Sequence, residues 1–198
     1  LLEPASIVAK AWDHIERIGR RARWVPRTVL VTGAGPVGLL AGLLAAQRGL
    51  AVTLLDLHRD GPKPDLARAL GAEYRTDAAA AAAAQADIVI ECTGAPQVIL
   101  DVIGAVPPNG IVCLTGLSSS RRGVLVDLAR LNQSLVLENN VVFGSVNANR
   151  AHYEQAGNAL AAADTRWLGG LLSRRVPLDR WAEALEPRPD DVKVTIAP

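Results

Sequence analysis

The sequence predicts an α/β protein built on a doubly wound, parallel Rossmann sheet with strand order 3-2-1-4-5-6. Two observations lead to this prediction. Short apolar runs, typical of strands buried on both faces, alternate along the chain with segments of helical periodicity. The stretch from Thr28 to Leu55 reads as strand, glycine-rich turn, helix and strand, which is a βαβ unit.

Length and composition fit one sizeable domain with additional elements. The chain has 198 residues, and its 21 basic and 20 acidic residues give a net charge of +1. This balance gives no indication of nucleic acid or of an anionic membrane as a partner. Apolar runs are interrupted by charge or glycine before they reach membrane-spanning length, and the start lacks the layout of a signal peptide. We therefore expect a soluble, cytoplasmic protein.

The turn of the βαβ unit carries a dinucleotide fingerprint, Gly33-Ala34-Gly35-Pro36-Val37-Gly38. Gly33 permits a tight turn, Gly35 lets backbone amides approach a pyrophosphate, and Gly38 lets helix and strand pack closely. Pro36 suits a first helical turn, where an N–H has no intrahelical partner. The free N–H groups and partial positive charge at such a helix start favour phosphate.

The second strand of the unit, Val52 to Leu55, ends at Asp56. Asp56 lies 18 positions past Gly38, near the spacing of about 20 expected for the acid that holds the adenosine ribose. Such an aspartate accepts hydrogen bonds from both ribose hydroxyls and repels a 2′-phosphate, which predicts NAD rather than NADP. Arg59 can contact either the adenine or a phosphate, so NADP stays open. A structural turn that binds no nucleotide is the alternative, and the combined context argues against it.

The other elements are predicted in chain order from periodicity and turn residues. A long amphipathic helix, Pro4 to about Arg23, reads as a connector from a preceding domain. Then come a loop over 57–65, a helix over 66–70, a strand near 72–74 and a bland surface helix over the alanines 78–84. Strands follow at 87–90 and 110–114, helices at 96–105 and 127–134, and an extended segment at 135–146. The tail gives helices at 153–163, 166–172 and 178–185 and a strand at 192–196.

These elements divide the chain into three parts. Residues 1–26 are the connecting helix, 27–150 the dinucleotide-binding domain, and 151–198 a tail returning towards a catalytic domain. The strand at 192–196 has no place in the parallel sheet, so we expect it to pair with a part of the protein absent from this sequence. The chain contains no methionine, and Leu1 is an improbable residue to follow an excised initiator, which favours a fragment.

Ligands of doubly wound sheets bind at the carboxyl ends of the strands, around the reversal of strand order. We expect one crevice there, lined by the residues that end strands and by Leu117: Gly33, Asp56, Thr93, Gly94, Thr115, Gly116 and Leu117. Cys92 and Cys113 also lie near strand ends, and we interpret them as structural rather than catalytic.

Five motifs resemble the coenzyme-binding half of zinc-type medium-chain alcohol dehydrogenases, in the glucose and sorbitol dehydrogenase branch. They are Leu2-Glu3-Pro4, Glu91-Cys92-Thr93-Gly94, Leu114-Thr115-Gly116, Gly144-Ser145-Val146-Asn147-Ala148-Asn149 and Arg188-Pro189-Asp190-Asp191-Val192-Lys193. The last two resemble glucose dehydrogenases most specifically, because a generic Rossmann sheet needs neither.

The resemblance implies an oxidoreductase that transfers hydride from a sugar or polyol hydroxyl to NAD(P). Its catalytic zinc would be held in an N-terminal GroES-like domain that this sequence lacks, so we expect no zinc in the chain itself. Glu3 would sit at that zinc, and Asn147 would reach the nicotinamide or the substrate. The alternatives are a favourable helix-dipole charge at Glu3 and a turn residue at Asn147. Relatives pair across a twofold axis, which implies a homodimer or homotetramer.

Two other functions remain open at this point. A nucleotide-sensing regulatory module also uses a Rossmann unit, but it has no need of the Glu3-Pro4 helix or of the final strand. A zinc-independent medium-chain reductase is the second alternative, and Glu3 argues against it.

Overall fold

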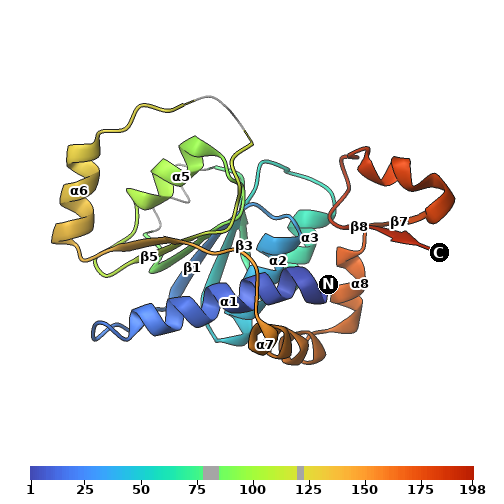
Figure 1. Ribbon diagram of the computed structural model, residues 1–198, viewed down its shortest axis with the longest axis horizontal. Helices are drawn as coiled ribbons and strands as arrows, with labels where there is room; N and C mark the ends of the chain where they lie inside the picture. Colours follow the sequence, from blue (N-terminus) through green and yellow to red (C-terminus); the bar gives the residue numbers. More distant parts are fainter. Residues whose placement is uncertain (78–84, 120–122) are drawn as a thin grey trace.

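The computed structural model describes residues 1–77, 85–119 and 123–198. The predicted helix over alanines 78–84 lies outside this part of the chain. Six parallel strands form one sheet in the order β3-β2-β1-β4-β5-β6, which confirms the predicted topology (Figure 1). They are β1 (Thr28–Thr32), β2 (Ala51–Leu55), β3 (Glu73–Arg75), β4 (Ile88–Glu91), β5 (Ile111–Leu114) and β6 (Val141–Gly144).

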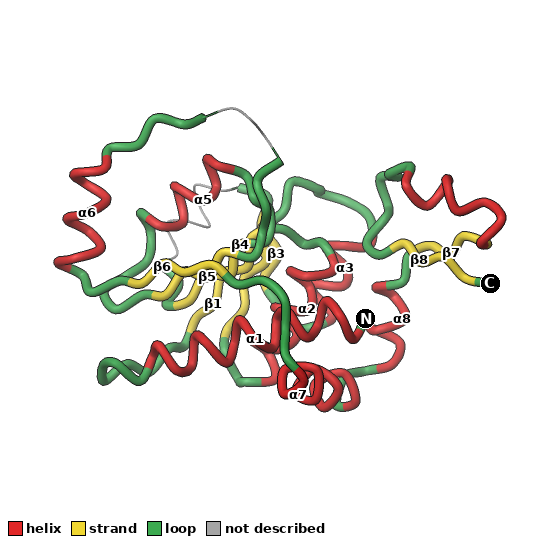
Figure 2. Tube along the Cα trace, in the orientation of Figure 1, coloured by secondary structure: helices red, strands yellow, loops and turns green. Residues whose placement is uncertain are grey.

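Helices cover both faces of this sheet (Figure 2). One layer contains α1 (Leu2–Gly19), α2 (Pro36–Gln47), α3 (Pro62–Ala69), α7 (Arg150–Ala161) and α8 (Thr165–Leu171). The other contains α5 (Pro96–Ile103) and α6 (Leu128–Leu137). The strands are apolar on both faces because each face packs on a helical layer. No helix in the described ranges is both long and apolar enough to cross a membrane.

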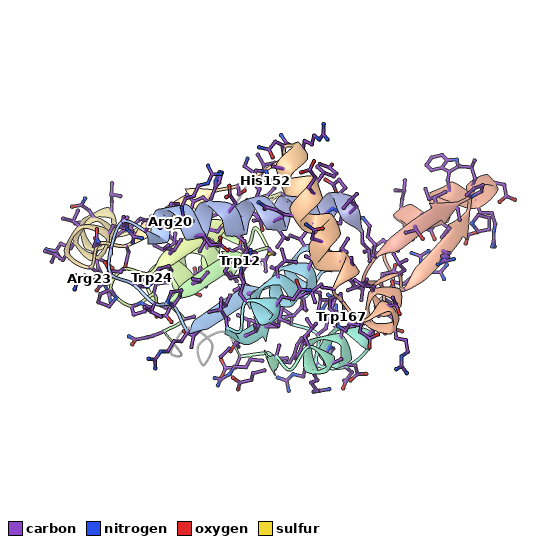
Figure 3. The ribbon with its side chains drawn as sticks, turned by 90° about the horizontal axis from the view of Figure 1, so that it is seen from below. Trp12, Arg20, Arg23, Trp24, His152 and Trp167 are labelled. Carbon is purple, nitrogen blue, oxygen red and sulfur yellow. The ribbon has the colours of Figure 1, made fainter. Side chains whose placement is uncertain are left out.

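Helix α2 is buried nearly all round, which is the pattern of a helix enclosed in a core rather than of a surface helix. It packs between the sheet and α1, where Leu39, Leu40 and Leu44 are each at most 2% exposed. Trp12 of α1 lies against this layer (Figure 3). His152 of α7 lies at the contact between α7 and α1, where its Nε2 is 3.4 Å from Asp13 Oδ2.

Helix α1 ends at Gly19, four residues before the predicted end. The chain turns there and lays the indole of Trp24 on the bare glycine: a Cβ at position 19 would lie 2.8 Å from Trp24 Cζ3. Trp24 therefore packs on the end of α1 from the connecting segment that follows the helix.

Two further predicted boundaries need correction. Helix α3 begins at Pro62, not at residue 66, because proline is well suited to the first helical position. Helix α6 continues to Leu137, so only Val141–Gly144 of the predicted extended segment 135–146 is a strand. The Asp127 carboxylate caps the start of α6 by accepting a 3.0 Å hydrogen bond from the Arg130 amide.

The tail differs most from the prediction. The final strand, β8 (Val194–Ala197), pairs in parallel with β7 (Arg174–Pro177), a strand of this same chain that its two arginines made unrecognisable in the sequence. Arg174 forms two bonds to the Asp191 carboxylate, of 3.0 and 2.7 Å, and this pair ties β7 to the segment before β8. Between the strands, Leu178–Leu185 forms a 3₁₀ helix, η1, with a kink at Arg180.

Candidate nucleotide-binding crevice

The first βα turn has the geometry that its glycines predict. Gly33 has a φ of +88°, and its amide donates a 2.7 Å hydrogen bond to Leu55 O at the end of β2. A Cβ at Gly38 would lie 1.7 Å from Gly33 O. Gly33 therefore supplies the tight turn and Gly38 the close approach of helix and strand.

Helix α2 begins without a side-chain cap within the described part of the chain. Gly35 is the N-cap residue, Pro36 is the first helical residue, and the first intrahelical bond runs from Leu39 N to Gly35 O at 2.9 Å. The amides of Val37 and Gly38 come before Leu39 in the first helical turn, so they have no carbonyl acceptor within the helix. A Cβ at Gly35 would have no neighbour within 4 Å, so the space beside this helix start is open to an anion.

Asp56 closes the turn from the β2 side. Its Oδ2 accepts a 2.7 Å bond from the Ala34 amide, and its Oδ1 accepts a 3.0 Å bond from the His58 amide. His58 Nδ1 is 2.6 Å from the same Oδ1. Burial disfavours the charged carboxylate, but the bonds from His58 and Ala34 and the charge of Lys63 outweigh it, so the pKa of Asp56 lies below its usual range.

Lys63 is a neighbour of Asp56 that the sequence did not indicate. Its Nζ lies 3.4 Å from Asp56 Oδ2 and 3.1 Å from His58 Nδ1, and its side chain is only 13% exposed. The lysine reaches this position because α3 starts at Pro62 and carries Lys63 in its first turn. Recognising Pro62 as a helix start would have placed a cation beside Asp56.

These residues border a hollow of about 350 Å³, within the size range of small-molecule sites. Its lining comes from the first turn, the ends of β2, β3 and β4, and the start of α5: Thr32, Gly33, Gly35, Leu55, Asp56, Leu57, His58, Thr76, Cys92, Thr93, Ala95 and Val98. Of the predicted crevice residues, Gly33, Asp56 and Thr93 are among them. Arg59 is exposed and outside the lining.

The other predicted strand-end residues meet beside this hollow, where the ends of β4 and β5 interlock. Gly94 has a φ of +67°, and a Cβ there would lie 2.4 Å from Leu117 O. A Cβ at Gly116 would lie 2.2 Å from Gly94 N. Thr115 donates through its hydroxyl to Glu91 O at 2.8 Å, so β4 and β5 are joined at their carboxyl ends. Leu117 itself has its side chain exposed.

Both cysteines lie at the carboxyl ends of strands: Cys113 is in β5, and Cys92 directly follows β4. Burial raises the pKa of the Cys92 and Cys113 thiols to about 12, so neither is a thiolate at neutral pH. Cys113 is fully buried, and Cys92 accepts a 3.2 Å contact from Thr115 Oγ1.

Glu3 and Asn147 lie outside the hollow lining. Glu3 is exposed in the first turn of α1, and Asn147 is exposed with a φ of +60°, a turn conformation that asparagine tolerates. No group of three or more His, Cys, Asp or Glu side chains within residues 1–77, 85–119 and 123–198 is arranged to hold a metal ion. A catalytic zinc takes three protein ligands, so Glu3 does not make a zinc site with the described residues alone.

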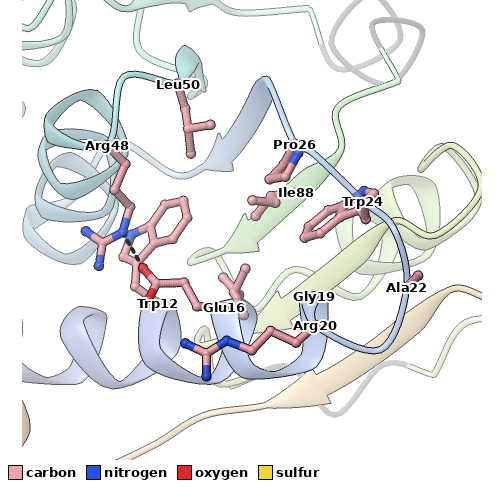
Figure 4. A pocket seen from close by; sticks show the side chains of 11 residues that line it. Trp12, Glu16, Gly19, Arg20, Ala22, Trp24, Pro26, Arg48, Leu50 and Ile88 are labelled. Atoms are coloured by element: carbon pink, nitrogen blue, oxygen red, sulfur yellow. Dashed lines mark hydrogen bonds and ion pairs between the residues drawn. The ribbon is translucent and has the colours of Figure 1, made fainter.

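A second hollow, of about 530 Å³, lies at the opposite, amino end of the strands (Figure 4). Trp12 and Trp24 form facing walls, and the Arg48 guanidinium stacks 4.8 Å from the Trp12 ring while donating a 2.8 Å bond to Glu16 Oε1. It shares no residue with the crevice around Asp56.

The sequence matches a known family over nearly its whole length. The family model described as "Glucose dehydrogenase C-terminus" matches residues 1–197. The chain belongs to the glucose dehydrogenase C-terminus family. This confirms the resemblance to the glucose dehydrogenase branch.

Glucose dehydrogenase relatives are similar along the same length. The chain is 41% identical to "Glucose 1-dehydrogenase" of Methanocella arvoryzae over 206 residues, covering 99% of this chain and 57% of that protein. It is 41% identical to "Glucose 1-dehydrogenase 2" of Vulcanisaeta moutnovskia, covering 99% and 58%. The chain thus spans less than two thirds of the length of these relatives.

Solved structures show the same fold. Glucose dehydrogenase of Haloferax mediterranei, solved with NADP, Zn and gluconolactone, superimposes with a TM-score of 0.90 at 28% identity, covering 99% of this chain and 57% of that one. 2R,3R-butanediol dehydrogenase of Bacillus subtilis gives a TM-score of 0.76 at 20% identity, covering 100% of this chain and 56% of that one, and shares the fold.

Proposed function

We propose that this chain is the coenzyme-binding part of an NAD(P)-dependent, zinc-assisted glucose dehydrogenase or closely related sugar or polyol dehydrogenase. The observation that carries the proposal is the hydrogen bond from Ala34 to Asp56 beside a helix start that has no side-chain cap. Amides that would receive phosphate therefore lie next to a carboxylate that would accept from the ribose. The matches to glucose dehydrogenases along 99% of the chain support the substrate class.

Each part of the crevice takes one part of the coenzyme. The amides at Gly35, Val37 and Gly38 receive the pyrophosphate, with Gly33 and Pro36 shaping the turn. Asp56 accepts from the adenosine ribose hydroxyls. The ends of β4 and β5, with Thr93, Gly94, Thr115, Gly116 and Leu117, border the nicotinamide.

The coenzyme we propose is NAD, with some use of NADP. The Asp56 carboxylate opposes a 2′-phosphate, whereas Lys63 and the exposed Arg59 offer positive charge to it. The Haloferax mediterranei relative holds NADP, which supports the dual use. The preference between NAD and NADP depends on Asp56, because this carboxylate lies at the end of β2 and is held in place by hydrogen bonds from the amides of Ala34 and His58.

Turnover needs groups beyond the described ones. When bound in the longer enzyme, zinc would polarise the sugar hydroxyl. We propose that its ligands come mainly from an N-terminal domain, with Glu3 near them and Asn147 near the nicotinamide or substrate. Residues 1–26 and 151–198 flank the nucleotide-binding domain 27–150 and would face that catalytic domain. The assembly we propose is a cytoplasmic homodimer or homotetramer.

Two measurements test this function. Calorimetric titration with NAD⁺ is expected to show binding by the 198-residue chain. An NADH-formation assay with glucose, other aldoses and polyols in added zinc is expected to show no turnover, because positioning and charge stabilisation supply most of the rate. Turnover by this chain would show that we have assigned the catalytic groups to the wrong half of the enzyme. A lack of coenzyme binding would contradict the proposal itself.

A nucleotide-sensing module would give the same titration. The discriminating result is complementation: a separately expressed zinc-binding domain of a relative restores sugar oxidation if the chain is a dehydrogenase part and leaves it inert if the chain is a sensor. A zinc-independent reductase would instead be active after zinc is removed from the complemented enzyme.

A further inference from the structure

Glu91 is a fully buried carboxylate at the end of β4, with 0% exposure. Burying a carboxylate without partners is costly, so such a group is retained only where it is well bonded. We infer that Glu91 is a positioning residue that holds the ends of β1, β4 and β5 in the arrangement that receives the nicotinamide half of the coenzyme. The inference rests on the proposed function and adds to it a residue that acts from beneath the crevice.

The Glu91 side chain collects donors from two strand ends. Its Oε1 accepts from Thr32 Oγ1 at 3.2 Å, from the Thr93 amide at 2.6 Å and from the Gly94 amide at 3.1 Å, and it also bonds the Thr93 hydroxyl. Its Oε2 accepts from the Gly94 amide at 3.1 Å. Thr32 ends β1, whereas Thr93 and Gly94 follow β4, so the carboxylate joins the two.

The Glu91 main chain joins the third strand end. Its carbonyl accepts from the amides of Thr115 and Gly116 at 2.8 and 3.0 Å. A Cβ at Gly116 would lie 2.8 Å from Glu91 Oε2. The carboxylate therefore occupies the space that any side chain at position 116 would need, and the β5 end packs directly on it.

The position of Glu91 in the sheet assigns it to the nicotinamide half. In a doubly wound sheet the two mononucleotide halves lie on opposite sides of the strand-order reversal. Asp56 and His58 lie at the end of β2, on one side of β1, and Glu91 lies on β4, on the other side. Loss of the carboxylate should therefore disturb the nicotinamide side while the adenosine side is held by Ala34 and Asp56.

The test compares NAD⁺ with ADP-ribose, which lacks the nicotinamide, by calorimetric titration of the whole chain. Glu91→Gln keeps the shape but turns an NH₂ group towards amide and hydroxyl donors. We expect this variant to bind NAD⁺ about tenfold more weakly and ADP-ribose less than about twofold more weakly. The tenfold loss is the size of effect expected when one buried donor is left unpaired. Leu171→Ala removes buried apolar contact in α8 and is the control for general destabilisation. It should leave the ratio of the two affinities unchanged.

Thr32→Val removes one Glu91 donor without changing side-chain shape and keeps the test decisive if Glu91→Gln does not fold. Thr32→Val should change the ratio of NAD⁺ affinity to ADP-ribose affinity in the same direction, by about threefold, because it removes only one of the several hydrogen bonds to the carboxylate. Equal weakening of both ligands, no change in NAD⁺ affinity, or a wild-type chain that binds NAD⁺ no more tightly than ADP-ribose would each overturn the inference while leaving coenzyme binding intact. Failure of the wild-type chain to bind either ligand would instead overturn the proposed function, and the inference with it.

Discussion

The main-chain amide of Ala34 donates a 2.7 Å hydrogen bond to Asp56 Oδ2, so the glycine turn after β1 and the end of β2 form one bonded unit. The same carboxylate is bonded by His58 and approached by Lys63. The Asp56 carboxylate, which we propose selects the coenzyme, is therefore already held in place by the amides of Ala34 and His58.

Replacing Asp56 by alanine should narrow the preference for NAD over NADP. The wild-type preference is expected to be about 1–3 kcal/mol, the scale of a desolvated polar mismatch. Without the carboxylate, the repulsion of a 2′-phosphate disappears and Lys63 is left to attract it. Parallel titrations with NAD⁺ and NADP⁺ measure the gap. Wild-type binding of NADP⁺ that equals or exceeds that of NAD⁺ would contradict the prediction.

Gly35→Val should abolish coenzyme binding in a folded chain. The site of the new side chain is open, with no atom within 4 Å of its Cβ, so the sheet behind it is undisturbed. The branched side chain would occupy the space that the pyrophosphate needs. Circular dichroism reports the fold and calorimetry the loss of binding. Coenzyme affinity retained by a folded variant would show that the turn does not hold phosphate.

Gly38→Ala should unfold the domain rather than only its site. Its Cβ would lie 1.7 Å from Gly33 O, a backbone atom that cannot move away without breaking the turn. We expect a loss of more than about 3 kcal/mol in the free energy of unfolding, measured in urea. Gly157→Ala is the matched control, because this glycine lies in α7 with nothing within 4 Å of its Cβ. It should leave stability unchanged or raise it by up to about 1 kcal/mol.

Acid should remove the stabilisation that the Asp56 carboxylate provides. Its pKa is lowered in the folded state, so below about pH 4 the unfolded chain binds more protons at this position than the folded chain. The stabilisation is complete above the ordinary pKa and is lost as the pH falls through the folded one. Urea unfolding of wild type and Asp56→Asn should therefore differ at pH 7 and converge towards pH 3.

The chain should form a homodimer through the β6 end of the sheet. Strand β6 is the last in the order β3-β2-β1-β4-β5-β6, so one of its edges faces no strand among the described residues. Such edges are normally covered or paired. Sedimentation over a range of concentrations should give the dimer mass, whereas a monomer mass at every concentration would rule this assembly out.

The sheet and the first turn could be predicted because their signals are local. Buried strands such as Ile88–Glu91 are apolar at nearly every position, and the roles of Gly33 and Gly38 follow from backbone sterics alone. Strand β7 could not be predicted, because Arg174 reads as surface until Asp191 is placed beside it. The pairing of β8 was missed for the same reason.

The candidate site shows the same limit. Asp56 is marked by its spacing from the glycines, but Lys63 becomes its neighbour only once α3 is correctly started at Pro62. Glu91 reads as the polar end of an apolar strand. Its partners Thr32 and Gly116 are distant in the sequence and meet it only in the folded sheet.

The parallel pair of β7 and β8 has a consequence for the dynamics of the chain. Its connecting helix η1 contains no buried residue, and Leu178, Trp181 and Leu185 are more than half exposed. The strands β1 and β4, by contrast, lie in the middle of the six-stranded sheet, with fully buried side chains. Amide hydrogens of the tail should therefore exchange with deuterated solvent through local opening, long before those of the central strands, which wait for global unfolding.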